Sequence, residues 1–157
     1  MVESASSRAT DRAGGAWAAL IDVDRLKRFN MHNGHVAGDQ VLVKLAKFLL
    51  SLARNGCIQV VRMGGQEFAL ICLGDEDADD QDGRATCERI LGWARESLTP
   101  EQPKHCGLPD CVGPTQLTLS IALARIEPGE SSASLRERLE MAMQKAKGAG
   151  RDRVEST

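Results

Sequence analysis

Two apolar runs flank a Gly-Gly turn in the stretch Val60-Val61-Arg62-Met63-Gly64-Gly65-Gln66-Glu67-Phe68-Ala69-Leu70-Ile71. Runs rich in Val, Ile and Leu that are joined by a short glycine turn are typical of a β-hairpin. Glycine permits positive φ and carries no Cβ, so a bulky ligand can approach the backbone at Gly64 and Gly65. Gln66 and Glu67 begin the returning strand. The sequence therefore predicts a hairpin that presents polar side chains at its tip, with Arg62 placed to brace the turn.

An earlier apolar run ends in two aspartates. It reads Ala18-Ala19-Leu20-Ile21-Asp22-Val23-Asp24 and is followed by Lys27 and Asn30. Carboxylates at the end of a buried strand are costly unless they bind something. Asp24 follows Asp22 by two positions, so both side chains project from the same face if the strand continues that far. Two roles stay open for Asp24, which can orient a site or cap the turn.

Apolar periodicity predicts three helices and four strands. We expect a strand at about 18–23, a short loop, a helix at about 39–54, the hairpin at about 58–73, a helix at about 84–98, a strand at about 116–126 and a helix at about 134–147. Asp39 stands where a helix N-cap or first-turn anion is favoured. The βαββαβ order is that of a ferredoxin-like palm, an α+β fold with a central antiparallel sheet and flanking helices.

Bulk properties exclude several classes of protein. The 157 residues suit one domain, which we expect at 16–157 after a flexible N-terminal tail at 1–15. The net charge of −2 gives no basic footprint for nucleic acid. No apolar run is long enough to span a bilayer, and the first residues lack the apolar core of a signal peptide. These features predict a cytoplasmic protein that binds neither nucleic acid nor membrane.

The cysteines and the acidic stretch offer no convincing metal site. The five cysteines lack Cys-x-x-Cys spacing, which favours reduced thiols over a disulfide framework. His105-Cys106 with Cys111 lacks a fourth ligand, so the segment 99–113 is interpreted as a connection. In the acidic stretch 74–83, Asp82 stands where a calcium-binding EF-hand loop needs glycine, so a solvated loop is favoured.

The hairpin and the aspartate segment together resemble the GGDEF domain, the diguanylate cyclase family, whose members condense two GTP molecules into cyclic di-GMP. Family members carry Asp-x-Asp-x-x-Lys-x-x-Asn, Gly-His-x-x-Gly-Asp, Arg-Tyr-Gly-Gly-(Asp/Glu)-Glu-Phe, Ser-Ile-Gly and Ala-Lys-x-x-Gly-Arg. The matching segments, in the same order, are Asp22 to Asn30, Gly34 to Asp39, Arg62 to Phe68, Ser120 to Ala122 and Ala146 to Arg151. The resemblance covers Ala18 to Val154, which is most of the chain.

The resemblance implies a palm as in nucleotidyl cyclases and a reaction that uses Mg²⁺ or Mn²⁺. Such ions prefer oxygen ligands and usually take one or two protein carboxylates. By resemblance Asp22 is a metal ligand, the Val23 carbonyl is a second, and Glu67 can also reach the ion. The alternative for Asp22 is a cap of the turn that follows the strand. The resemblance makes Glu67 and Gln66 the candidate catalytic residues.

The resemblance also implies a set of residues that bind GTP. They are Lys27, Asn30, Asp39, Gly64, Gly65, Lys147 and Arg151. The three basic side chains suit the triphosphate. Asn30 and Asp39 offer an amide and a carboxylate to the donor and acceptor edge of guanine. Without the resemblance, Asp39 is only a helix cap and each lysine is a solvated surface group.

Several positions depart from the family pattern. Gln66 stands where active members carry an Asp or Glu metal ligand, and an amide brings no charge, so ion binding should weaken. Met31 and Gln144 replace the usual Asp and Tyr. The product-inhibition motif Arg-x-x-Asp would fall on 55–58, where Asn55 and Ile58 do not match, and the usual Asp-x-Leu-Thr-Gly-Leu-x-Asn-Arg segment is missing from 1–17.

Three functions therefore compete. The leading hypothesis is a degenerate bacterial GGDEF domain that binds GTP with little or no cyclase activity and acts as a nucleotide-binding or signalling interaction module. The alternative is an active diguanylate cyclase, or a related cyclic-dinucleotide synthase, that works as a Mg-dependent homodimer. The third is a structural domain without a nucleotide. The expected partners are GTP and either a second copy of the chain or a partner signalling protein.

Overall fold

The computed structural model describes residues 15–53, 57–73, 80–98 and 116–157, with side chains left out at 80–82. The elements in chain order are β1 (Trp17–Val23), α2 (Leu26–Asn33), α3 (His35–Leu52), β2 (Ile58–Gly64), β3 (Glu67–Cys72), α4 (Asp80–Ser97), β4 (Leu119–Arg125), α5 (Ser132–Gly148) and β5 (Arg153–Ser156). Residues 1–14 of the expected tail, 74–79 of the expected acidic loop and the expected connection 99–113 lie outside these ranges, so the boundary between tail and domain stays a prediction. The expected loop is wrong at 80–83, because α4 already begins at Asp80.

The sheet has the strand order β2-β3-β1-β4-β5. β1 pairs antiparallel with both β3 and β4, and β2 pairs antiparallel with β3. This arrangement confirms the predicted α+β palm. β5 was not predicted, and it pairs parallel with β4, so the sheet is mixed rather than wholly antiparallel.

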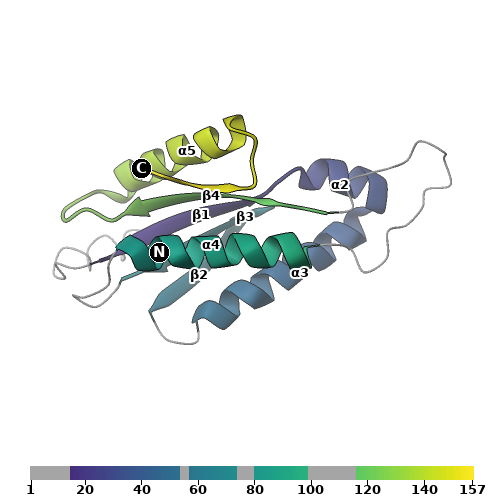
Figure 1. The fold of residues 1–157 in the computed structure, drawn as a ribbon, viewed down its shortest axis with the longest axis horizontal. Helices are drawn as coiled ribbons and strands as arrows, with labels where there is room; N and C mark the ends of the chain where they lie inside the picture. The colour runs from purple at the N-terminus through teal and green to yellow at the C-terminus, as the bar shows by residue number, and fades with distance from the viewer. Residues whose placement is uncertain (1–14, 54–56, 74–79, 99–115) are drawn as a thin grey trace.

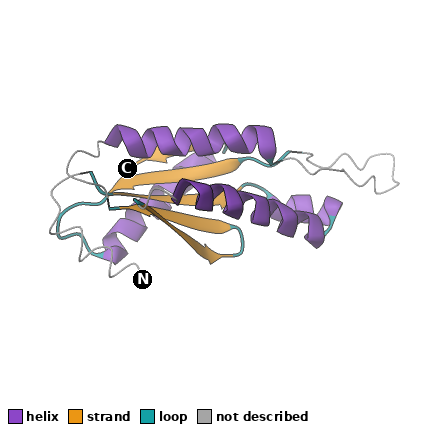
Figure 2. Ribbon diagram, turned by 90° about the horizontal axis from the view of Figure 1, so that it is seen from below, coloured by secondary structure: helices purple, strands orange, loops and turns teal. Residues whose placement is uncertain are grey.

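Helices cover both faces of the sheet (Figures 1 and 2). Successive side chains of a strand point to opposite faces, and β1 divides its apolar residues accordingly. Trp17, Ala19 and Ile21 belong to the larger core, which also holds buried residues of α2, α3 and α4. Ala18 packs in the smaller core with residues of β4 and α5. β1 therefore lies between two layers, and Asp22 and Asp24 lie on either side of its last residue, Val23.

The segment after β1 corrects the expected loop, because it forms the helix α2. Arg25 precedes this helix in a left-handed conformation with φ 57°. Leu26 and Phe29, almost one helical turn apart, are the buried residues that fasten it to the core. Two buried apolar residues in eight positions are too few for a periodicity signal, which explains why the helix was not predicted.

The expected start of the next helix is also wrong. α3 begins at His35 rather than near Asp39, and Gly34, with φ 84°, is its N-cap. Asp39 therefore lies in the second turn of α3 and does not cap it. Among the described helices, none combines the length and apolar composition that a membrane span requires.

Candidate nucleotide-binding site

The hairpin tip is a glycine turn that two contacts hold in place. Gly64 and Gly65 have φ 148° and 50°, a region that side-chain-bearing residues rarely adopt. Arg62 donates from Nε and Nη2 to the Gly65 carbonyl at 3.2 and 2.7 Å, as its position predicted. The Val23 amide donates to the Gln66 carbonyl at 3.3 Å. The tip is thereby tied to the end of β1, where the aspartates lie.

Asp22 is buried at this junction and contacts two donors. Lys147 Nζ lies 3.1 Å from Asp22 Oδ2. Gln66 Nε2 donates to both carboxylate oxygens, at 3.4 Å to Oδ1 and 3.2 Å to Oδ2. A buried carboxylate is tolerated when it is paired and hydrogen-bonded. The structure thus brings together three predicted site residues from β1, the hairpin tip and α5.

Asp24 binds elements that come much later in the chain. It accepts hydrogen bonds from the hydroxyls of Thr118 and Ser120, each at 2.7 Å. It also accepts from the Asp152 amide at 3.3 Å, and Arg151 Nε lies 3.9 Å away. These contacts favour a structural role for Asp24 over a role in orienting a site. Asp24 also holds the turn that carries Arg151. Both aspartates face the α5 side, as their spacing predicted.

A cavity of about 280 Å³ opens between α2, the start of α3 and the hairpin tip. Leu26, Lys27, Asn30, Met31, His35 and Gln66 line it. Asn30 Oδ1 is buried and has no hydrogen-bond partner among the described residues. It lies against Gly38, where an added Cβ would come within 1.9 Å. The glycine lets the Asn30 side chain pack against α3, where its amide oxygen accepts no hydrogen bond from the described residues.

Two other predicted nucleotide ligands, Asp39 and Arg151, are not in the wall of this cavity. Asp39 is exposed on α3, one residue after Gly38, and is not a lining residue. Arg151 is half-buried with φ 68°, in the turn between α5 and β5. Its Nη1 donates to the Lys147 carbonyl at 3.5 Å, which keeps the two basic residues together.

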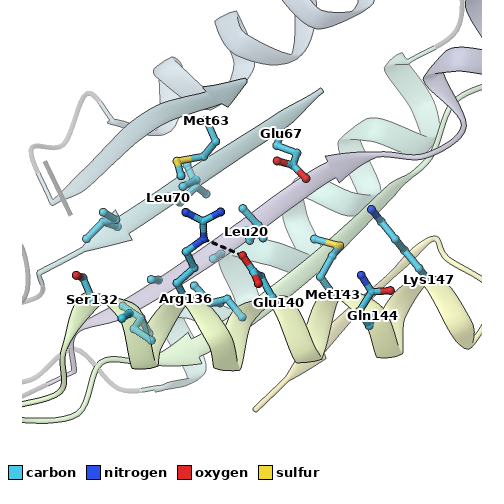
Figure 3. Close-up of a pocket in the computed structure, with 17 residues that line it drawn as sticks. Leu20, Met63, Glu67, Leu70, Ser132, Arg136, Glu140, Met143, Gln144 and Lys147 are labelled. Atoms are coloured by element: carbon cyan, nitrogen blue, oxygen red, sulfur yellow. Dashed lines mark hydrogen bonds and ion pairs between the residues drawn. The ribbon is translucent and has the colours of Figure 1, made fainter. Parts of the chain in front are cut away.

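A larger cavity of about 520 Å³ lies between α5 and the β1–β3 face (Figure 3). Met63, Glu67 and Leu70 face Met143, Gln144 and Lys147 across it. Gln66, in the turn, lines the first cavity, and Glu67, the first residue of β3, lines the second. Glu67 is the register partner of Asp22 across β1 and β3, so its role as a metal ligand stays a prediction.

The side chains as arranged do not fit a resident divalent ion. The Asp22 carboxylate is engaged by an ammonium and an amide donor, and Asp24 by two hydroxyls and a backbone amide. Within the described ranges, no three His, Cys, Asp or Glu residues are grouped to hold a metal. Ligation of Mg²⁺ or Mn²⁺ by Asp22, Val23 and Glu67 stays a prediction from the resemblance.

Comparison with known proteins decides the family. The family model described as diguanylate cyclase, GGDEF domain, matches residues 1–153. The chain belongs to the GGDEF family. The diguanylate cyclase DgcM of Escherichia coli K12 is 38% identical over 135 residues, which are 86% of this chain and 29% of that protein. The GGDEF domain thus spans less than a third of this relative.

Solved GGDEF structures share the fold. The GGDEF domain of DgcB from Caulobacter crescentus, solved in complex with c-di-GMP, is 29% identical with a TM-score of 0.78, over 99% of this chain and 82% of that one. The active GGEEF domain of a Vibrio cholerae diguanylate cyclase is 25% identical with a TM-score of 0.79, over 99% and 90%. The signature of the Vibrio domain has Glu in the place that Gln66 takes in this chain.

Sequence reasoning missed several contacts that shape the site. Gly38 lay inside a matched motif, but its close approach to Asn30 was not foreseen. Thr118 and Ser120 alternate along a predicted strand, which was the available signal that both hydroxyls reach one partner. A ferredoxin-like sheet sets the first strand beside the hairpin and so predicts that Asp22 and the tip converge, but the direct hydrogen bond between Gln66 and Asp22 was not predicted.

Proposed function

We propose that this GGDEF domain binds GTP beside α2 and the hairpin tip and makes little or no cyclic di-GMP. The observation that carries the proposal is the hydrogen bond from the Gln66 amide to the Asp22 carboxylate. Gln66 takes the place of a family metal ligand. Its side-chain amide donates a hydrogen bond to Asp22, which the resemblance makes the other metal ligand. The domain then serves as a nucleotide-binding or signalling interaction module.

Support for nucleotide binding comes from the side chains around the smaller cavity. Lys27, Asn30 and Gln66 share its wall, and Lys147 and Arg151 lie on the other side of the aspartates. The cations suit phosphate groups, and the Asn30 amide suits the edge of a purine base. The proposal assigns guanine recognition to Asn30 together with Asp39.

A second candidate is a working diguanylate cyclase, because DgcM carries that name at 38% identity. That function needs Mg²⁺ or Mn²⁺ and two domains face to face, each with one GTP. It would also need Asp22 to exchange its present donors for an ion. We therefore rank it below the GTP-binding module.

The proposal also covers partners and cellular place. We infer a cytoplasmic bacterial protein, because GTP is a cytoplasmic metabolite and the relatives named above are bacterial. A second copy of the chain or a partner signalling protein would distinguish the GTP-bound domain from the nucleotide-free one. DgcM is much longer than this domain, so its activity is not carried over whole.

The test is a calorimetric titration of GTP and ATP in buffer with Mg²⁺, followed by chromatography of the nucleotide. We expect GTP to bind more tightly than ATP and to be recovered unchanged. Asp39→Ala should lower the affinity for GTP and reduce the preference for GTP over ATP. Glu96→Ala, which removes an exposed carboxylate on α4, should change neither quantity. Equal affinities would overturn the guanine assignment, and no binding would favour a purely structural domain.

A further inference from the structure

The donors around Asp22 lead to an inference about how the nucleotide is held, which rests on the proposed function. We propose that this site takes GTP without a divalent ion, because Gln66 and Lys147 satisfy the Asp22 carboxylate in place of the ion. The proposal reverses the metal requirement that the family resemblance implies. The arrangement is specific to this chain, because Gln66 departs from the family signature and donates to Asp22.

The first argument is geometric. Lys147 Nζ and Gln66 Nε2 lie 3.1 and 3.2 Å from the same oxygen, Asp22 Oδ2, and Nε2 also reaches Oδ1 at 3.4 Å. A magnesium ion would have to approach a carboxylate oxygen to about 2.1 Å. An ion at Oδ2 would therefore have to displace Lys147 or turn the Gln66 amide away.

The second argument is electrostatic. Asp22 is matched by Lys147, and Asp24 by Arg151, so these four groups are neutral before any nucleotide arrives, and Glu67 is the further carboxylate opposite Asp22. Gln66 adds no charge. A glutamate there, as in the GGEEF signature, would set a second carboxylate beside Asp22. Two carboxylates at such a distance repel unless a cation joins them. Gln66 thus leaves this junction with one carboxylate fewer than the GGEEF signature supplies.

The third argument concerns the phosphates. An ammonium has three donors, and Lys147 directs one of them to Asp22. The remaining donors, with the Arg151 guanidinium and the exposed Lys27 at the rim of the smaller cavity, can neutralise a triphosphate. Protein cations therefore supply the positive charge that an ion would otherwise bring.

The experiment measures GTP affinity by calorimetry in EDTA and in Mg²⁺ for the full chain and for Gln66→Glu. For the wild type we expect affinities that agree within about 3-fold, since the ion makes no bond to the protein. For Gln66→Glu we expect binding in EDTA to weaken by about 10-fold or more and to recover in Mg²⁺. Gln59→Glu, an equal charge change at an exposed position of β2, should behave as the wild type.

A second experiment measures the binding of Mn²⁺ to the protein by electron paramagnetic resonance, in the absence of nucleotide. We expect the wild type to leave Mn²⁺ free and Gln66→Glu to bind it. Wild-type GTP binding that disappears in EDTA would overturn the metal-independent site while leaving the proposed function intact. No GTP binding in either buffer would overturn both. The wild-type comparison decides the matter even if the variant does not fold.

Discussion

The Gln66 side-chain amide lies 3.2 Å from the carboxylate of Asp22, although 44 positions separate the two residues in the chain. The sheet makes this contact possible, because β1 and β3 are neighbours and Asp22 pairs with Glu67 in register. Gln66 therefore reaches from the hairpin turn to the end of β1, which is the neighbour of β3 in the sheet. In the Vibrio cholerae GGEEF domain a charged residue has this place in the signature. The contact links a change in sequence to a change in what the site can bind.

Gly38→Ala should weaken GTP binding without unfolding the domain. A Cβ at this position would come within 1.9 Å of Asn30 Oδ1, so the Asn30 side chain would have to leave its place in the cavity wall. Alanine is otherwise favoured over glycine in a helix by about 1 kcal/mol. We expect GTP affinity to fall by about 10-fold, measured by calorimetry, with little loss of stability.

Gly92→Ala is the matched control, because Gly92 lies within α4 and an added Cβ meets nothing within 4 Å. It should raise stability slightly and leave GTP binding unchanged. Unaltered GTP affinity in Gly38→Ala would show that Asn30 does not contact the nucleotide.

Asp24→Ala should destabilise the domain more than Asp22→Ala. Removing Asp24 leaves the buried Ser120 hydroxyl without its acceptor and frees the turn at Arg151 and Asp152. Breaking such a buried network costs about 3 kcal/mol. Asp22→Ala instead releases Lys147, whose side chain is 27% exposed and can reach water. Urea unfolding of both variants measures the difference, and an equal loss would contradict the structural role of Asp24.

Cyclic di-GMP should bind weakly to the monomer. The DgcB domain was solved in complex with this molecule, but Asn55 and Ile58 of this chain lack the guanidinium and carboxylate of the family's product-inhibition motif. Calorimetry with the purified product should give no submicromolar affinity. A tight site that disappears when Asn55 is replaced would show that this segment binds the product by other means.

The parts of the fold that sequence predicted are those with long periodic patterns. The hairpin was predicted by two apolar runs and a glycine turn, and α5 by its recurring apolar residues. The short elements escaped prediction because their signals are weak. α2 buries only Leu26 and Phe29, and β5 has four residues, so neither carries a full period. The start of α3 was misplaced because Gly34, rather than Asp39, ends the preceding turn.

The candidate site, like the fold, could be predicted only in part. The identities of Asp22, Lys27, Asn30 and Gln66 followed from motif spacing, and the structure places them around one junction. The partners of Asp24 could not be predicted, because Thr118 lies 94 positions away and only the sheet brings it near. Nor could sequence alone show that Gln66 and Glu67, adjacent in the chain, line different cavities.

The central claim is that Gln66 leaves a GTP-binding domain with little cyclase activity. The most direct measurement is cyclic di-GMP formation by chromatography, with the wild type and Gln66→Glu each fused to the same dimeric coiled coil in Mg²⁺ and GTP. Asp22→Ala in the Gln66→Glu background serves as the control. We predict that the wild type yields little product, that Gln66→Glu raises the rate by about 100-fold or more, equivalent to several kcal/mol of barrier, and that Asp22→Ala abolishes the gain. Fast turnover by the wild type that Gln66→Glu does not improve would contradict the account.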